Sequence, residues 1–576
     1  MVGRPVPIGT VVLASSDPVR RGPWIHAAAL ALVLAATLAV IPRNGSFSSD
    51  DGAYAGAVVA LRHGHWYLDR PIPVVDQANE GWINSTITPA GPLPYSVYPA
   101  YPRLMTAVVG VVHPGVGADE PAARIGLGLR LLPAAGALAA AVTAWLLAAR
   151  YDRRAAPVAF WLVGTGPLLV NATTLWAHTL STALAGVACL AALTVIGNPD
   201  PPAPVGGRAG RSPWRPPVGA TLALAGTIGA GVLLRSDGLL WALAVVATLA
   251  VVGRSRSDRV AAVVVLGATA TAAVAGRAWA ASIRADALPI RTGVIGLDDP
   301  GWLAGRLPAA WRLLLTDLLP GPAPFLSITA ILAAATAAVI LRSHPDHTWP
   351  ARRLLWASCG LWLVQLVLTV TGRIEALPVS GLVAAWPVPF VLIVAARADR
   401  DTVRRLLPLL APVALMIVAV LATQYTESGG LQWGGRYLST AFVPLAVAAA
   451  VVGHDTVRRH RSPVLALMAA PAVFGLLVSW SLHQRHAGVA EAMTLDEPAV
   501  VLTGSPAATR VAWPILPTAV YRADGDSLDP LLADLAARGL SPVTVHGLPD
   551  VELDGRAGYR LDVDRGDYRT LVLDRP

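Results

Sequence analysis

Long apolar runs, separated by short arginine-rich segments, dominate this chain. A helix needs about 20 mostly apolar residues to cross the hydrocarbon core of a bilayer. Runs of this kind begin near Trp24, Gly126, Ala155, Thr174, Val218, Gly238, Val260, Pro324, Leu354, Ser380, Leu406, Tyr437 and Pro463. Because lipid offers the backbone no hydrogen-bond partner, each run is predicted to be a helix. The sequence therefore predicts an α-helical polytopic membrane protein with about 13 transmembrane helices.

The composition excludes a single water-soluble domain and intrinsic disorder. Of the 576 residues, 54% are hydrophobic and 14% are charged, whereas soluble domains carry about 25% charged residues, and disorder needs low hydrophobicity. The net charge of +9 comes from clusters between apolar runs, so it does not indicate nucleic-acid binding. Cys189 and Cys359 both lie inside apolar runs and are expected to be small buried hydrophobes.

The distribution of arginine predicts the orientation. Alternate loops hold the arginine clusters 20–21, 150–154, 208–215, 254–259, 342–353, 397–405 and 458–461, whereas the opposite short loops hold only Arg235, Arg373 and Arg436. The positive-inside rule then places residues 1–23 in the cytoplasm as an N-terminal tail. With an odd number of spans the C-terminus lies outside.

Two long outer loops and a terminal domain complete the predicted organisation. Within the transmembrane domain 24–486, the loops 43–125 and 282–322 contain the amphipathic or apolar stretches Ala53–Leu68, Arg103–His113 and Trp302–Leu319, which we expect at the interface. In residues 487–576 the long apolar runs give way to shorter strand-like and helical patterns. Strand-like runs at 499–502, 543–545 and 568–573 and a helical pattern at 528–538 predict a small α/β extracytoplasmic domain.

An acidic pair, Asp50-Asp51, follows the first span. Mutual repulsion and partial burial can raise the pKa of one carboxyl group, which suits a general base. Such a pair also binds divalent cations or hydroxyl-rich substrates. The alternative is a helix N-cap in which Ser49 or Asp50 accepts hydrogen bonds from free backbone N–H groups. The residues alone leave both interpretations open.

Four motifs in order resemble the GT-C superfamily of membrane glycosyltransferases, which includes protein O-mannosyltransferases and lipid A aminoarabinose transferases. The motifs are Asp50-Asp51-Gly52-Ala53-Tyr54, Tyr98-Pro99-Ala100-Tyr101-Pro102-Arg103-Leu104, Arg235-Ser236-Asp237-Gly238-Leu239-Leu240 and Gln432-Trp433-Gly434-Gly435-Arg436-Tyr437-Leu438. The resemblance implies a polyprenyl-phosphate-linked sugar donor, an outer-face reaction and Asp50 as the general base of an inverting displacement. Asp51 would then position the acceptor or tune the pKa of Asp50.

A leaving phosphate needs positive charge, which arginine supplies through paired hydrogen bonds. Arg436 is the first candidate for binding the donor phosphate, because it follows Trp433 and two glycines at the start of a span. Arg235 is the second candidate. Snorkelling toward the interface is the alternative for both side chains.

Further substrate contacts are predicted for Tyr54, Glu80, His178 and Trp433. An ionisable residue such as His178 within an apolar run is a functional candidate by default, although a structural hydrogen bond would also explain it. Asp76 and Glu80 also suit a solvated loop, and Asp298-Asp299 before Pro300 suits a helix start. His63 and His65 suit interfacial anchoring. The sequence has no zinc-ligand spacing, P-loop or dinucleotide fingerprint, and a divalent cation is the one cofactor that its acidic residues would suit.

These observations predict a multi-pass cell-membrane glycosyltransferase that acts on an envelope glycan, lipid or protein and binds no nucleic acid. The alternatives are a transporter or flippase for lipid-linked glycans and a non-catalytic scaffold. Transporters often carry repeated halves with charges at the midplane, whereas here the acidic residues concentrate in outer loops and no repeat is visible. If the chain is an enzyme, Asp50 and Arg436 should face one outer cavity despite their separation in the sequence.

Overall fold

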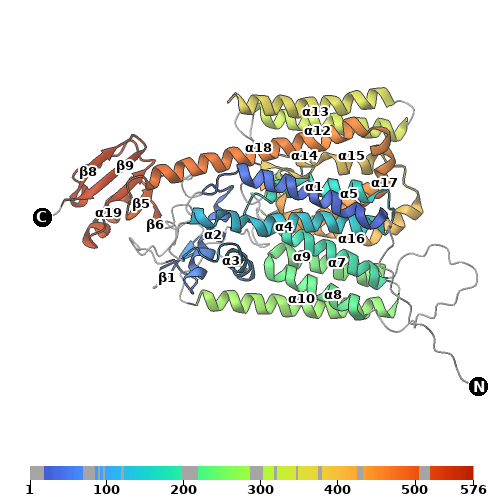
Figure 1. Cartoon of the computed structure of the whole chain (residues 1–576), viewed down its shortest axis with the longest axis horizontal. Coiled ribbons are helices and arrows are strands. Elements are labelled where there is room, and N and C mark those ends of the chain that lie inside the picture. Colours follow the sequence, from blue (N-terminus) through green and yellow to red (C-terminus); the bar gives the residue numbers. More distant parts are fainter. Residues whose placement is uncertain are drawn as a thin grey trace, which may run out of the picture.

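The computed structural model describes residues 18–68, 85–88, 91–94, 98–117, 122–196, 218–253, 255–285, 302–316, 321–344, 348–373, 379–423, 432–504 and 519–574. The protein is mostly α-helical, with a bundle of long helices and a small sheet domain at one end (Figure 1). The predicted fold class is confirmed.

Nine helices of the described chain are long and apolar enough to cross a membrane. They are α1 (Pro18–Val40), α4 (Ala122–Ala149), α7 (His178–Ile196), α10 (Arg256–Ile283), α12 (Pro322–Ser343), α13 (Thr348–Val370), α16 (Arg400–Thr423), α17 (Phe442–Arg459, preceded by the 3₁₀ helix η1, Arg436–Ala441) and α18 (Arg461–Thr494). Each coincides with a predicted apolar run.

The other four predicted runs are helical but shorter or interrupted. Helices α8 (Val218–Leu234) and α9 (Ser236–Val252) have 17 residues each. The run near 155 divides into α5 (Ala156–Gly164) and α6 (Pro167–Asn171), and the run near 380 into α14 (Leu382–Ala385) and α15 (Pro387–Ala395). The indole Nε1–H of Trp386, which lies between α14 and α15, donates to the carbonyl of Leu162 near the end of α5 (2.9 Å). A side chain at one helix break thus satisfies a backbone carbonyl beside the other break.

Small residues allow the helices at the centre to approach closely. In α17 the whole segment 446–450, Ala-Val-Ala-Ala-Ala, is at most 2% exposed. Gly186 of α7 lies against Thr143 of α4 and Val443 of α17, so a Cβ there would meet both side chains. Helix association inside a bilayer depends on such packing, because lipid tails are as apolar as the side chains they replace.

Short elements lie in the loops between the spans. Helices α2 (Ser49–Arg62), α3 (Ala100–Val112) and α11 (Trp302–Leu314) match the predicted amphipathic stretches to within a few residues. Strands β1 (Ser85–Thr88) and β2 (Gly91–Pro94) form an antiparallel pair, and β3 (Val379–Ser380) runs parallel to β4 (Gln432–Trp433). Helix α2 lies at the end of the bundle that carries the sheet domain (Figure 1).

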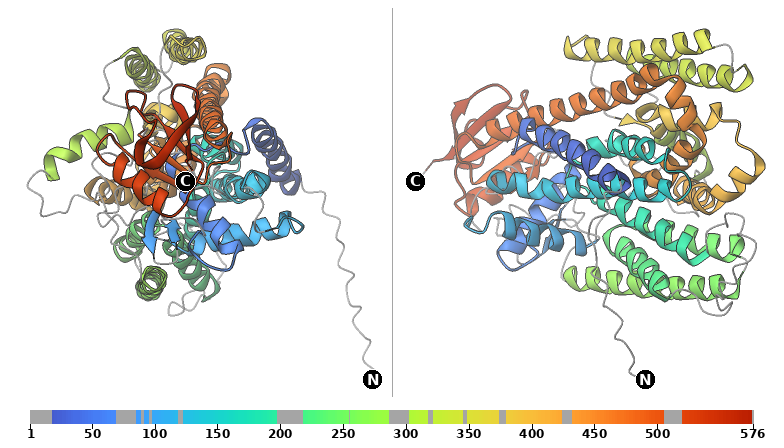
Figure 2. Two further views of the ribbon diagram at one scale, coloured as in Figure 1. Left: turned by 90° about the vertical axis from the view of Figure 1, so that its left-hand side faces the viewer. Right: turned by 45° about the vertical axis from the view of Figure 1, so that its right-hand side comes forward.

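The C-terminal domain is a five-stranded sheet covered by one helix. Its strand order is β6 (Ala519–Arg522), β5 (Val500–Thr503), β7 (Val543–His546), β9 (Tyr568–Leu573) and β8 (Tyr559–Asp564). Strands β6, β5 and β7 are parallel to one another. Strand β9 is antiparallel to both of its neighbours, β7 and β8. Helix α19 (Leu528–Ala537) buries its leucines against the sheet, and the 3₁₀ turn η4 (Arg556–Gly558) precedes β8. The right view of Figure 2 shows this domain at one end of the molecule, beyond the last turns of α18.

Candidate functional site

The acidic pair opens α2, and its two carboxylates have different environments. Ser48 is the N-cap residue of this helix and makes no side-chain capping bond. Asp51 is fully buried, and its carboxylate accepts hydrogen bonds from the backbone N–H groups of Phe47 (2.7 Å) and Leu175 (2.9 Å). Asp51, rather than Ser49 or Asp50, therefore satisfies the backbone at this helix start, and it also joins α2 to the loop before α7.

Burial makes the ionised form of Asp51 costly. Desolvation raises the pKa of Asp51 from 3.8 to about 6, although the two backbone hydrogen bonds and the nearby Arg130 oppose the shift. A carboxylate with both oxygens bonded to the backbone is poorly placed to exchange protons with a substrate. The geometry indicates a positioning role for Asp51.

Arg130 of α4 is the buried cation beneath Asp51. Its guanidinium donates to the backbone carbonyls of Gly45 (2.7 Å), Gly126 (3.2 Å) and Thr173 (3.3 Å). One side chain thus fixes the segment that leads into α2 and the segment that leads into α7. Glycine is required at position 45, since a Cβ there would collide with the backbone carbonyl of His483 in α18.

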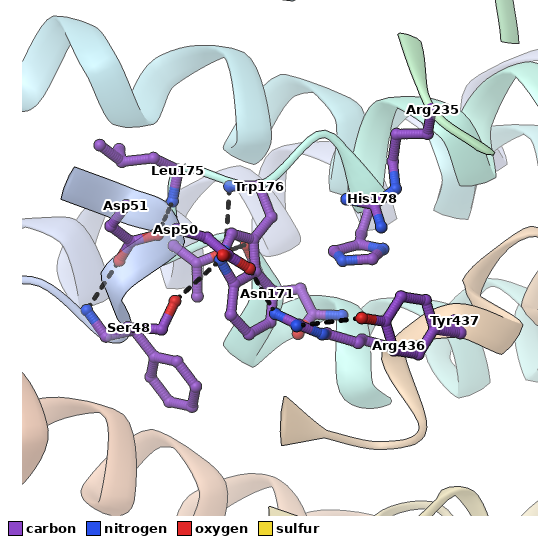
Figure 3. A network of polar contacts seen from close by, with 12 residues as sticks. Ser48, Asp50, Asp51, Asn171, Leu175, Trp176, His178, Arg235, Arg436 and Tyr437 are labelled. Atoms are coloured by element: carbon purple, nitrogen blue, oxygen red, sulfur yellow. Dashed lines mark hydrogen bonds and ion pairs between the residues drawn. The ribbon is translucent and has the colours of Figure 1, made fainter. Parts of the chain in front are cut away.

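Asp50 contacts Arg436, although the two residues are 386 positions apart in the sequence. The Arg436 Nη1 atom lies 2.8 Å from Asp50 Oδ2 (Figure 3). The Arg436 side chain is 7% exposed, and the Asp50 side chain is 44% exposed. The pair therefore has one buried partner and one partner open to the surroundings.

Two glycines and two aromatic rings place Arg436. Gly434 and Gly435 both adopt positive φ angles (+70° and +63°) in the turn between β4 and η1, which favours glycine. The guanidinium carbon of Arg436 lies 4.7 Å from the ring centre of Trp176 and 5.1 Å from that of Tyr437, at cation–π distance. Its Nη2 atom also donates to the hydroxyl of Tyr437 (3.3 Å).

A second ion pair lies at the junction of α8 and α9. Arg235 Nε is 2.8 Å from Asp237 Oδ1, and Asp237 is fully buried. The other Asp237 oxygen accepts from the Ser439 hydroxyl (3.4 Å), which lies 3.3 Å from His178 Nδ1. The Ser439 hydroxyl therefore links the buried Asp237 carboxylate to the His178 ring.

Unsatisfied polar atoms gather around these ion pairs. His178 Nε2 and both polar side-chain atoms of Asn171 are buried without a hydrogen-bond partner among the described residues. Arg235 and Arg436 are the two charged groups that act on the His178 ring, and Figure 3 shows that ring between them. Buried polar atoms normally find partners, so these atoms mark a place where a polar ligand would be satisfied.

The remaining predicted residues are more scattered. Tyr54 packs edge-on against Tyr101 (5.2 Å between ring centres), and burial raises the pKa of Tyr54 to about 12, so its hydroxyl is a proton donor at neutral pH. Trp433 is 1% exposed and packs against Phe474 (5.9 Å), so the ring stacked on Arg436 is that of Trp176. Glu80 lies outside the described residues, as do Asp76, Asp298 and Asp299.

His63 and His65 lie just beyond α2, with ring centres 6.0 Å apart, and His65 stacks on Tyr67 at 4.0 Å. Within the described ranges, no group of three or more His, Cys, Asp or Glu side chains could hold a metal ion.

Several side chains of the candidate site were not predicted from the sequence. Arg130 has a clear sequence signal, because a charged residue within an apolar run marks a functional or structural polar site. Asp237 lies in the motif that begins with Arg235, and its ion pair with Arg235 is between residues two positions apart. Asn171, Trp176 and Ser439 have no comparable signal, since only the tertiary fold brings them to the acidic helix.

Comparisons with known proteins return solved structures only. No protein-family model and no curated protein matches the chain. It is similar to ArnT from Cupriavidus metallidurans bound to undecaprenyl phosphate, with 13% identity and a TM-score of 0.42 over 96% of this chain and 98% of that one. It is also similar to the archaeal oligosaccharyltransferase AglB from Archaeoglobus fulgidus in complex with an inhibitory peptide and a dolichol-phosphate, with 12% identity and a TM-score of 0.47 over 92% of this chain and 70% of that one.

Both are membrane glycosyltransferases of the GT-C superfamily.

Proposed function

We propose that this protein is a membrane glycosyltransferase that moves a sugar from a polyprenyl-phosphate-linked donor to a hydroxyl group of a cell-envelope acceptor. The observation that carries the proposal is the contact between Asp50 and Arg436, a half-exposed carboxylate beside a buried guanidinium. A proton acceptor and a phosphate-binding group are the two functions that such a transfer needs at one place. The resemblance of the four sequence motifs to those of GT-C enzymes is the reason for proposing glycosyl transfer.

The reaction is one displacement. Asp50 accepts the proton of the acceptor hydroxyl as its oxygen attacks the anomeric carbon of the donor sugar. The bond between that carbon and the phosphate oxygen breaks, and its electron pair leaves with the lipid phosphate. Arg436 stabilises the phosphate through charge-assisted hydrogen bonds. Attack opposite the leaving group inverts the anomeric configuration.

The surrounding residues position these groups. Asp51 and Arg130 hold the start of α2, and hence Asp50, against the loop before α7. Arg235 is bound to the buried Asp237, which fixes its guanidinium at the start of α9. The positive-inside pattern predicts that α2 and the C-terminal domain lie on the outer side of the membrane, where envelope acceptors are found.

The test is complementation of a deletion strain followed by analysis of its envelope glycans. Wild type should restore the missing glycan, and Asp50→Asn should not, because a general base contributes about 10²- to 10⁴-fold to the rate. Asp562→Asn removes one exposed carboxylate of the C-terminal domain and is the matched control. Full restoration by Asp50→Asn would show that the catalytic assignment is wrong. Dependence of the transfer on a divalent cation is a separate hypothesis. It is tested by measuring transfer activity with and without a chelator.

A further inference from the structure

We propose that the donor phosphate displaces Asp50 from Arg436, so that binding of the donor is the event that frees the general base. This inference rests on the proposed function and concerns the regulation of the same site. In the structure the two catalytic groups neutralise each other at 2.8 Å. Without substrate, the Asp50 carboxylate and the Arg436 guanidinium are therefore bound to each other. This ion pair must open before Asp50 can accept a proton and Arg436 can bind a phosphate.

The contacts of the described carboxylates identify Arg436 as the guanidinium that can change partner. The described carboxylates of the site are those of Asp50, Asp51 and Asp237, and its described guanidinium groups are those of Arg130, Arg235 and Arg436. Both oxygens of Asp51 are bound by backbone N–H groups, and both oxygens of Asp237 are bound by Arg235 and Ser439. Asp50, in contrast, is bound by Arg436 through Oδ2.

The exposures of the two partners show which one would move. Arg436 is buried and keeps the rings of Trp176 and Tyr437 as neighbours without the help of Asp50. Asp50 is 44% exposed at the second position of α2, so its carboxylate can turn away into solvent at small desolvation cost. The fixed cation would therefore exchange a mobile carboxylate for a phosphate oxygen.

The exchange replaces one negative charge at Arg436 with another. Arg235 stays paired with Asp237 while Asp50 leaves Arg436. The phosphodiester of a donor with a single phosphate carries one negative charge, so it supplies to Arg436 the charge that Asp50 withdraws. The liberated Asp50 carboxylate then lies at the exposed side of the phosphate, where an acceptor hydroxyl can reach it.

The test measures the affinity of the purified full-length protein in detergent for undecaprenyl phosphate. Asp50→Asn and Asp50→Ala should each bind this probe about two- to five-fold more tightly than wild type, because they remove the competing carboxylate from a partly exposed pair. Arg436→Gln should weaken binding about ten-fold or more. Asp562→Asn should leave the affinity unchanged.

A double variant separates exchange from simple charge repulsion. If the phosphate takes the place of Asp50 on Arg436, the gain from Asp50→Asn should disappear in an Arg436→Gln background. Equal or weaker binding by both Asp50 variants overturns the exchange, and so does a gain that persists without Arg436. Failure of wild type and variants to bind undecaprenyl phosphate at all would instead refute the lipid-phosphate donor of the proposed function, and with it the exchange.

Discussion

Replacing Asp51 by Asn should raise the stability of the protein at neutral pH while lowering its activity. Asp51 is fully buried, and its pKa in the folded state is raised from 3.8 to about 6 by desolvation. A group with a raised folded-state pKa binds its proton more tightly in the folded protein. Its favourable contribution is complete below about pH 4 and is lost as the pH rises through 6.

The size of the effect follows from the shift. A difference of about two pKa units corresponds to roughly 3 kcal/mol at 1.36 kcal/mol per unit. Asn resembles the protonated carboxyl group in shape and charge. The variant should therefore match wild type near pH 4 and exceed it by up to about 3 kcal/mol above pH 7. Transfer should slow, because an amide nitrogen replaces one acceptor for the N–H groups of Phe47 and Leu175.

Thermal unfolding in detergent, followed by tryptophan fluorescence between pH 4 and 8, measures this difference. The melting temperature of wild type relative to Asp51→Asn should fall across the interval from pH 4 to 6 and then level off. Asp562→Asn controls for the general loss of one negative charge. A difference that is constant with pH, or a wild type that is the more stable protein above pH 6, would refute the reasoning.

Two further substitutions test how the site is held. Arg130→Gln leaves Asp51 without its buried counter-charge and frees the carbonyls of Gly45 and Thr173, so the free energy of unfolding should fall by about 3–5 kcal/mol. Thermal unfolding measures the loss, and a change below about 1 kcal/mol would show that these bonds are dispensable. Gly435→Ala places a Cβ at φ +63° and 2.6 Å from the Leu313 carbonyl, which strains the turn before Arg436. Affinity for undecaprenyl phosphate should drop, whereas Gly488→Ala, where a Cβ meets nothing within 4 Å, should leave it unchanged.

Hydropathy located all thirteen apolar runs, but it did not show which would be continuous. Pro133 and Pro471 lie inside the unbroken helices α4 and α18, whereas Pro167 and Pro387 begin new helices. The difference depends on whether a freed backbone group finds a partner elsewhere, as Leu162 does in the indole of Trp386. That partner is 224 residues away, so a local pattern does not reveal it.

The same limit applies to the candidate site. Because arginine is scarce on the predicted outer side, Arg436 and Asp50 could be singled out from the sequence as residues of one outer cavity. The aromatic ring beside Arg436 could not be predicted, since the fold brings in Trp176 and packs Trp433, the nearer residue in the chain, against Phe474. The roles proposed for Asp50, Arg436 and Arg235 stay predictions until the variants are measured.

Helix α18 sets the height of the C-terminal domain above the bilayer. At 1.5 Å per residue its 34 residues extend about 51 Å, roughly 20 Å more than the hydrocarbon core is thick. With Arg461 at the cytoplasmic surface, as the arginine pattern predicts, the last turns of α18 form a stalk that carries the five-stranded sheet beyond the lipid headgroups on the other side. The same stalk binds the backbone of the segment that leads into α2, because the Nδ1–H of His486 donates to the Ser46 carbonyl (2.7 Å). A tilt of the stalk would move the sheet and the approach to Asp50 together.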